Sequence, residues 1–175
     1  MDIKDVIHLL RLQRHDLMND LQIVHGYLSM GKNDKVKNKI NKIIEEFNRE
    51  RLLMNINCPN FALWLIQVNL QHNHIQFTYD IHTKSKNLHS YDSVLTKIGK
   101  TITRYILDDK LEIIKGELLL LENESILNMV ITLSGRPIDW NRWKERLSEE
   151  FENVLIQVED LEESIKFSFS ISSFE

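Results

Sequence analysis

Residues 3–30 read IKDVIHLLRLQRHDLMNDLQIVHGYLSM, a stretch with no proline and one glycine. Its aliphatic side chains recur at alternating steps of four and three residues, and we call them the apolar seam: Ile3, Ile7, Leu10, Leu17, Leu21, Val24 and Leu28. This heptad spacing is typical of a helix that packs lengthwise against other helices. Arg14 occupies the one position of the repeat that lacks an aliphatic side chain.

The residues after the seam predict a turn and a second helix. Gly31 is a typical helix stop, and we expect Asn33 or Asp34 to cap the next helix. Heptad spacing then returns at Val36, Ile40, Ile43, Phe47 and Met54, and the pattern ends near residues 55–59. Residues 1–57 are therefore predicted to form an antiparallel helical hairpin.

A hairpin alone leaves part of the apolar seam in water. Burial of an aliphatic side chain contributes about 1.5–3 kcal/mol, so pairing of two hairpins would be a large gain. We expect a homodimer in which the hairpins form a four-helix bundle. The alternative is that the hairpin packs on its own C-terminal domain.

Residues 58–175 predict a domain of a different kind. Hydrophobic periodicity indicates three helices, over residues 61–71, over residues 92–107 and in a segment capped by Asp139. It also indicates five strands, over residues 75–81, 117–122, 126–133, 154–158 and 165–171. Along the chain the order is helix, strand, helix, two strands, helix and two strands. This order is typical of an α+β fold. We expect a sandwich of one antiparallel sheet with helices on one face.

Composition narrows the functional classes. The 175 residues carry a formal net charge of −4, which does not favour binding to nucleic acid or to an anionic membrane surface. Cys58 is the single cysteine, so neither an internal disulfide nor a cysteine-rich zinc site is expected. The first five residues lack a secretory pattern, and no apolar run approaches the roughly 20 residues that span a bilayer. We expect a cytoplasmic protein.

One histidine stands apart from the seam. At about 100° per residue, His15 points roughly 130° away from the seam's centre, so it is expected to face water. Arg11, Asn19 and Gln22 lie on the same face by helical spacing. An exposed neutral imidazole has a free lone pair and can attack a phosphoryl group that another protein presents. The ordinary alternative is a surface histidine without a role.

The local string around His15 resembles a known family. Residues 14–22, RHDLMNDLQ, give the pattern R-H-D-x-x-N-x-L-Q at the start of a helical hairpin. It resembles the sporulation initiation phosphotransferases of the bacterial phosphorelay and, more loosely, the phosphoacceptor helix of citrate-type sensor kinases. The hairpin length, the turn near Gly31, the helix that starts at Tyr91 and Asp92 and the α+β remainder extend the resemblance over nearly the whole chain.

The resemblance implies a dimer that relays a phosphoryl group. The donor would be a phosphorylated single-domain response regulator, and the acceptor a response-regulator transcription factor that controls sporulation. His15 would carry the phosphoryl group, Asn19 would face the incoming aspartyl phosphate, and Asp16 would orient the imidazole. No cofactor is expected on the chain itself, and Mg²⁺ is expected in the receiver domain of the partner.

The remaining candidates lie beside His15. Arg14 either carries its guanidinium to the bundle surface or helps to neutralise the phosphoryl charge. Leu12 is expected to face outward as a contact for the partner, together with Arg11 and Gln22. Five lysines in the turn and the second helix could attract an acidic regulator, although a solvated helix face is the more ordinary explanation: Lys32, Lys35, Lys37, Lys39 and Lys42.

Metal binding has little support. His72 and His74 lie two residues apart without an assured third ligand, so no metal site is expected there.

Two other functions stay open. A histidine-bearing hairpin before an α+β domain is also the layout of a sensor kinase core, but the glycines after Pro59 do not form the glycine-rich boxes of a nucleotide site: Gly99, Gly116 and Gly135. The C-terminal domain therefore resembles a degenerate kinase ATP-binding domain, and we expect no autophosphorylation. The other alternative is a docking module that binds response regulators without phosphoryl exchange.

Overall fold

The computed structural model describes residues 2–72, 75–85, 87–109, 114–123, 126–134 and 140–172. The chain divides into two compact units, Met1–Arg51 and Leu52–Glu175. Each unit is described by itself.

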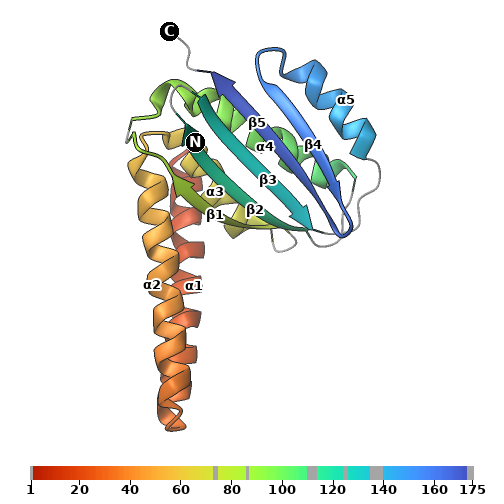
Figure 1. Cartoon of the computed structure of the whole chain (residues 1–175). Coiled ribbons are helices and arrows are strands. Elements are labelled where there is room, and N and C mark those ends of the chain that lie inside the picture. Colours follow the sequence, from red (N-terminus) through yellow and green to blue (C-terminus); the bar gives the residue numbers. More distant parts are fainter. Residues whose placement is uncertain are drawn as a thin grey trace. The chain divides into compact units, whose positions relative to one another are not determined.

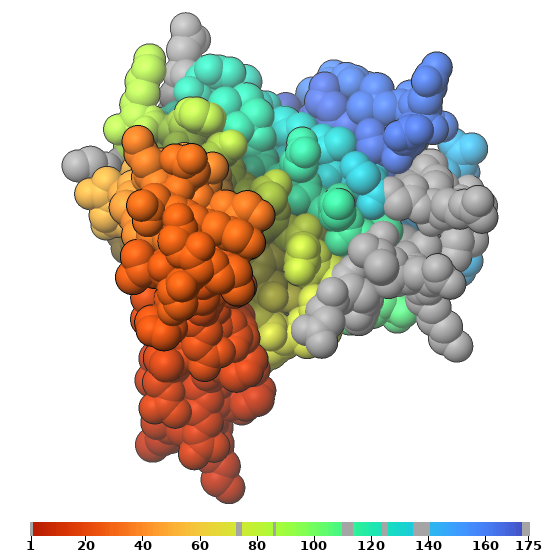
Figure 2. All heavy atoms as spheres, turned by 90° about the horizontal axis from the view of Figure 1, so that it is seen from below, coloured from red at the N-terminus to blue at the C-terminus, as the bar shows by residue number. Residues whose placement is uncertain are grey.

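The first unit is a helical hairpin, in which α1 (Ile3–Ser29) and most of α2 (Asn33–Asn55) lie side by side (Figures 1 and 2). Asp2 caps α1 through a capping box with Asp5. Gly31 ends the helix with a φ of 68°, and the amide of Lys32 donates to the carbonyl of Tyr27. This is a Schellman ending, which favours glycine. The hairpin and the stop at Gly31 are confirmed.

The cap of the second helix differs from the prediction. Because α2 already begins at Asn33, neither Asn33 nor Asp34 is its N-cap. Both residues lie in the first turn, where the negative charge of Asp34 is favourable beside the helix N-terminus.

The apolar seam stays uncovered in the single chain. Val24 is half-buried, and the other six seam residues of α1 are exposed, with fractions from 38% at Leu17 to 79% at Ile3. Ile40, Phe47 and Met54 of α2 are exposed in the same way. Two polar contacts join the helices: Gln13 with Glu50, and Asp20 with Lys39. An apolar surface of this length is available for another helix pair.

The second unit contains the rest of the secondary structure. Its elements are α3 (Pro59–Gln71), β1 (Ile75–His82), the 3₁₀ helix η1 (His89–Tyr91), α4 (Asp92–Asp108), β2 (Ile114–Asn123), β3 (Ile126–Ser134), α5 (Trp140–Glu150), β4 (Leu155–Leu161) and β5 (Ser164–Ser172). The element order agrees with the prediction. Asp139, the expected cap of α5, lies outside the described residues.

The five strands form one sheet in the order β1-β2-β3-β5-β4. Three of the four pairings are antiparallel, but β1 and β2 are parallel, with Ile75 opposite Ile114. The expectation of a wholly antiparallel sheet is therefore wrong. The segment between β1 and β2 contains η1 and α4, and such a crossover connection returns the chain to the same end of the sheet.

The helices cover one face of the sheet (Figure 1). Along β5 every second side chain is buried, from Ile165 to Ile171. Trp143 of α5 is buried on this face, with its ring 6.1 Å from Phe167 of β5 and 5.3 Å from Tyr105 of α4. The α+β class, with its helices on one face, is confirmed.

The N-terminus of α3 is capped from a distant part of the sequence. Cys58 is the N-cap residue, but its side chain does not cap the helix. The buried carboxylate of Asp92 accepts hydrogen bonds from the amides of Asn60 and Phe61, at 3.2 and 2.8 Å, and from the Asn60 side chain. Asp92 thus ties the start of α4 to the start of α3.

Candidate functional site

His15 lies in the middle of α1 and projects into solvent. Its side chain is 70% exposed and that of Asp16 is 64% exposed. The prediction that His15 faces water is confirmed by this exposure. A helix surface offers no cleft around the ring, so any reaction partner must bring its own enclosing site.

The imidazole is held through one of its two nitrogens. Nδ1 of His15 lies 3.2 Å from Oδ1 of Asp16 and 3.3 Å from the side-chain nitrogen of Asn19. Asn19 is one helical turn away, and Asp16 reaches the ring although it is the next residue along the helix. Of the predicted residues, the structure therefore brings His15, Asp16 and Asn19 together.

The two contacts of Nδ1 require different protonation states of this nitrogen. A carboxylate accepts only, so the contact with Asp16 needs a proton on Nδ1. An amide NH₂ donates, so the contact with Asn19 needs a lone pair there, unless the amide presents its oxygen. When Nδ1 carries the proton, the lone pair of a neutral ring lies on Nε2. The Asp16 contact thus favours the form of His15 that can act as a nucleophile through Nε2.

The other predicted site residues lie on the same helix and are not among the hydrogen-bond partners of His15. Arg11, Arg14 and Gln22 are exposed on α1, and in the described part of the chain the hydrogen bonds of His15 run to Asp16 and Asn19. Leu12 is half-buried, so its expected outward position is wrong. Leu12 and Gln13 lie three and four residues after Leu9, and all three are half-buried, so they share one face of α1, from which Gln13 bonds to α2.

Helix α1 is fixed to α2 close to the site. The side-chain amide of Gln13 donates to the carboxylate of Glu50 at 3.2 Å. Burial raises the pKa of Glu50 above its ordinary value, and the bond from Gln13 offsets part of that rise. Neither residue carries a sequence signal, because both are polar residues among many others on their helices.

A metal site has no support among the described residues. They contain no group of three or more histidine, cysteine or acidic side chains able to hold an ion. His74, one of the pair considered above, lies outside them.

The hairpin is similar to a domain of known proteins. Residues 1–56 match the family model described as sensor kinase SpoOB-type, alpha-helical domain. The chain is also similar to sporulation initiation phosphotransferase B of Bacillus subtilis (strain 168), with 33% identity over 98 residues, which are 56% of this chain and 51% of that protein. The alignment thus spans about half the length of this curated relative. The predicted resemblance to this family is confirmed.

Two solved structures are similar in shape. One is the catalytic domain of the histidine kinase ThkA, with a TM-score of 0.49 and 14% identity, covering 69% of this chain and 92% of that one. The other is a bacterial phosphotransferase, with a TM-score of 0.37 and 15% identity, covering 97% of each chain. Within the described residues, every helix is too short or too polar to span a lipid bilayer.

Proposed function

We propose that this chain is a histidine phosphotransferase of a cytoplasmic phosphorelay. Its hairpin accepts a phosphoryl group on His15 from the aspartyl phosphate of a single-domain response regulator and passes it to a second response regulator that controls sporulation. The observation that carries this proposal is an exposed imidazole on a SpoOB-type domain, held at Nδ1 by Asp16 and Asn19.

The transfer step uses the free nitrogen of His15. The lone pair of Nε2 attacks phosphorus, the bond between phosphorus and the aspartyl oxygen of the donor breaks, and the donor leaves as a carboxylate. The proton on Nδ1 stays on the ring, so the phosphorylated ring is cationic and its N–H points to the carboxylate of Asp16. In the second transfer a carboxylate oxygen of the acceptor attacks phosphorus, and the N–P electron pair returns to Nε2.

The receiver supplies what the helix surface lacks. In-line phosphoryl transfer needs positive charge around the phosphoryl oxygens, and in this proposal that charge is Mg²⁺ in the receiver's own site. Arg11 and Arg14 of α1 stand exposed on the helix that carries His15 and add positive charge beside it. Asn19 can donate a hydrogen bond to a phosphoryl oxygen once the proton on Nδ1 is engaged by Asp16.

The assembly in this proposal is a homodimer. The uncovered seam of α1, with Leu17 and Leu21 still 38% and 48% exposed, is long enough to pair with a second hairpin. His15 points away from that seam, so a four-helix bundle would leave the ring accessible to a receiver.

Incubation with a phosphorylated receiver domain tests the proposal. We expect phosphate that is labile in acid and stable in base to appear on the protein, since this is the chemistry of a phosphoramidate. His15→Ala should abolish it, whereas His8→Ala, a change of another exposed histidine of α1, should not. Equal labelling of both variants, or none of the wild type, contradicts the proposal. Label taken from ATP alone would favour the sensor kinase.

A further inference from the structure

The outer face of α4 presents a row of cationic side chains. Lys97, Lys100 and Arg104 follow one another at steps of three and four residues, so they share one face of the helix. They line a hollow of about 410 Å³, whose wall is completed by Ser93, Thr96, Thr101 and Glu150. The residues that line the hollow belong to the second unit, whereas His15 belongs to the first.

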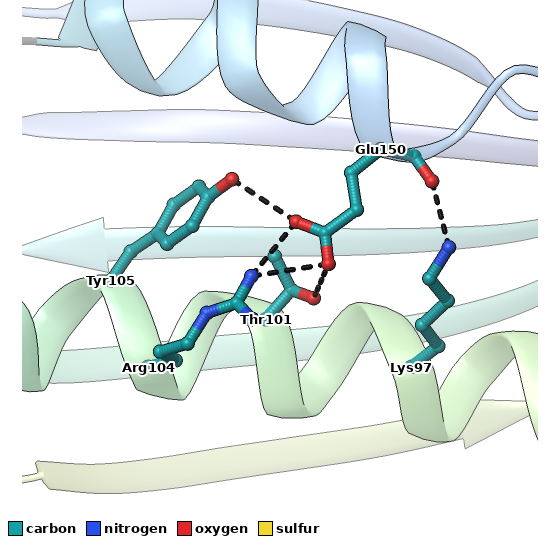
Figure 3. Close-up of polar contacts among 5 residues, drawn as sticks. All are labelled: Lys97, Thr101, Arg104, Tyr105 and Glu150. Atoms are coloured by element: carbon teal, nitrogen blue, oxygen red, sulfur yellow. Dashed lines mark hydrogen bonds and ion pairs between the residues drawn. The ribbon is translucent and has the colours of Figure 1, made fainter.

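One end of this row already binds a carboxylate. Arg104 donates to both oxygens of Glu150, at 2.8 and 3.1 Å, and the hydroxyls of Thr101 and Tyr105 donate to them at 3.1 and 3.3 Å (Figure 3). Burial alone would raise the pKa of Glu150. The hydrogen bonds from Thr101 and Arg104, with the charge of Arg104, outweigh burial and lower the pKa below its ordinary value. This face of α4 is therefore chemically suited to an oxyanion.

The other cations are not neutralised by Glu150. The ammonium of Lys97 donates to the backbone carbonyl of Glu150 at 2.7 Å and lies 4.6 Å from the ring centre of Phe151, so it is not paired with the carboxylate. Lys100 is exposed at the wall of the hollow. Three cations face one carboxylate, which leaves an excess of two positive charges on a chain whose net charge is −4.

We propose that this hollow binds a small anion carrying phosphate groups. A phosphate carries about −1.5 to −2 charge at neutral pH and three acceptor oxygens, which matches both the excess charge and the row of donors. A volume of about 410 Å³ lies within the range of small-molecule sites. Lys97 and Lys100 supply point charges, and Arg104 supplies a planar donor shared with Glu150. This site is independent of the phosphoryl transfer proposed above.

Titration of the full chain with inorganic phosphate, followed by calorimetry and by amide NMR shifts, tests the site. We expect saturable binding that perturbs the amides of residues 97–104. Lys100→Glu should abolish it. Lys144→Glu is the matched control, because it makes the same charge change at an exposed position of α5 outside the hollow, and it should bind like the wild type. No saturable binding, or the same loss in both variants, overturns the proposal.

The variant Glu150→Gln provides a second test, in which the affinity for phosphate should increase rather than decrease. It keeps an acceptor for Arg104 and Thr101 but removes the negative charge from the hollow, so affinity for phosphate should rise by about 3- to 10-fold. An unchanged or weaker affinity in this variant, with circular dichroism showing an intact fold, contradicts a site in which Glu150 competes with the ligand.

Two further probes identify the source of the phosphate. Pyrophosphate binding more tightly than ribose 5-phosphate indicates a free polyanion, and the reverse indicates a phosphate borne by an organic molecule. His15→Ala should bind every probe as the wild type does, so failure of the phosphotransferase proposal and failure of this one are separate results.

Discussion

The side-chain amide of Gln13 donates a hydrogen bond to the half-buried carboxylate of Glu50, and this bond joins the two helices of the hairpin. Gln13 lies two residues from His15, so the contact fixes the helix that carries His15.

Glu50→Gln should stabilise the hairpin at neutral pH. Burial raises the pKa of Glu50, so the ionised form is less favourable in the folded state than in the unfolded one. Because the pKa of Glu50 is higher in the folded state than the unfolded-state value of 4.5, the protonated side chain stabilises the folded state below pH 4.5. This contribution is lost as the pH rises through the folded-state pKa. Glutamine keeps an acceptor for Gln13 without the charge. The melting temperature, followed by helical circular dichroism, should therefore rise at pH 7 and change little at pH 4.

The exposed residue Glu45 of α2 provides the control. Glu45→Gln makes the same charge change without the contact to Gln13. An equal gain in both variants at pH 7, or a gain for Glu50→Gln that persists at pH 4, would show that burial of Glu50 is not the cause.

Asp92→Ala should destabilise the second unit by about 1–3 kcal/mol, because the buried amide of Phe61 would lose its acceptor. The amides of Asn60 and Phe61 both donate to this carboxylate, and Asp92 is only 3% exposed. Urea unfolding followed by tryptophan fluorescence measures the effect, because all three tryptophans lie in residues 52–175. Asp108→Ala, an exposed change at the other end of α4, should stay within about 0.5 kcal/mol of the wild type.

Replacement of two glycines by alanine should change stability in opposite directions. A Cβ on Gly99 of α4 would lie 2.6 Å from the ring of Trp64, a buried side chain that cannot move freely, so Gly99→Ala should cost about 1–3 kcal/mol. Around Gly26 of α1 no described atom lies within 4 Å of such a Cβ apart from its chain neighbours and the backbone of its own helix, so Gly26→Ala should stabilise the hairpin by about 0.5–1 kcal/mol. Chemical unfolding of each unit, by fluorescence for Gly99 and by circular dichroism for Gly26, distinguishes the two. A stabilising Gly99→Ala would contradict the close approach to Trp64.

A charge placed in the apolar seam should separate the dimer that we propose. Leu17→Glu introduces a carboxylate where two hairpins would meet, and burial of an unpaired charge is costly. Sedimentation velocity should give a dimer for the wild type and a monomer for the variant. Leu155→Glu, at a residue of β4 that is 64% exposed, should remain dimeric. A monomeric wild type would contradict the dimer.

Local sequence patterns predicted the parts of the molecule that depend on neighbouring residues. Heptad spacing predicted the helical hairpin, and the position of His15 within the repeat predicted that its side chain faces water. Both predictions succeed because the direction of a side chain on a helix depends only on residues within a few positions of it. Gly31 marked the end of α1 because its left-handed conformation favours glycine.

Contacts between distant residues could not be predicted in the same way. The parallel pairing of β1 with β2 depends on how the chain passes through η1 and α4, and alternation along each strand carries no information on this. Asp92 looked like the start of a helix, yet its carboxylate caps α3, which begins 33 residues earlier at Pro59. Glu150 meets Arg104 from 46 residues away, and nothing in the local sequence distinguishes it from the neighbouring Glu149.

Location of the phosphate after incubation with a phosphorylated receiver tests the central claim most directly. The protein should be kept at alkaline pH, digested and analysed by mass spectrometry that fragments peptides without losing phosphate. The account predicts one phosphorylated residue, His15, out of seven histidines, and a ³¹P NMR signal of an Nε2-phosphohistidine. Phosphate on another residue, or a wild-type chain that takes none while the receiver is still phosphorylated, would contradict it.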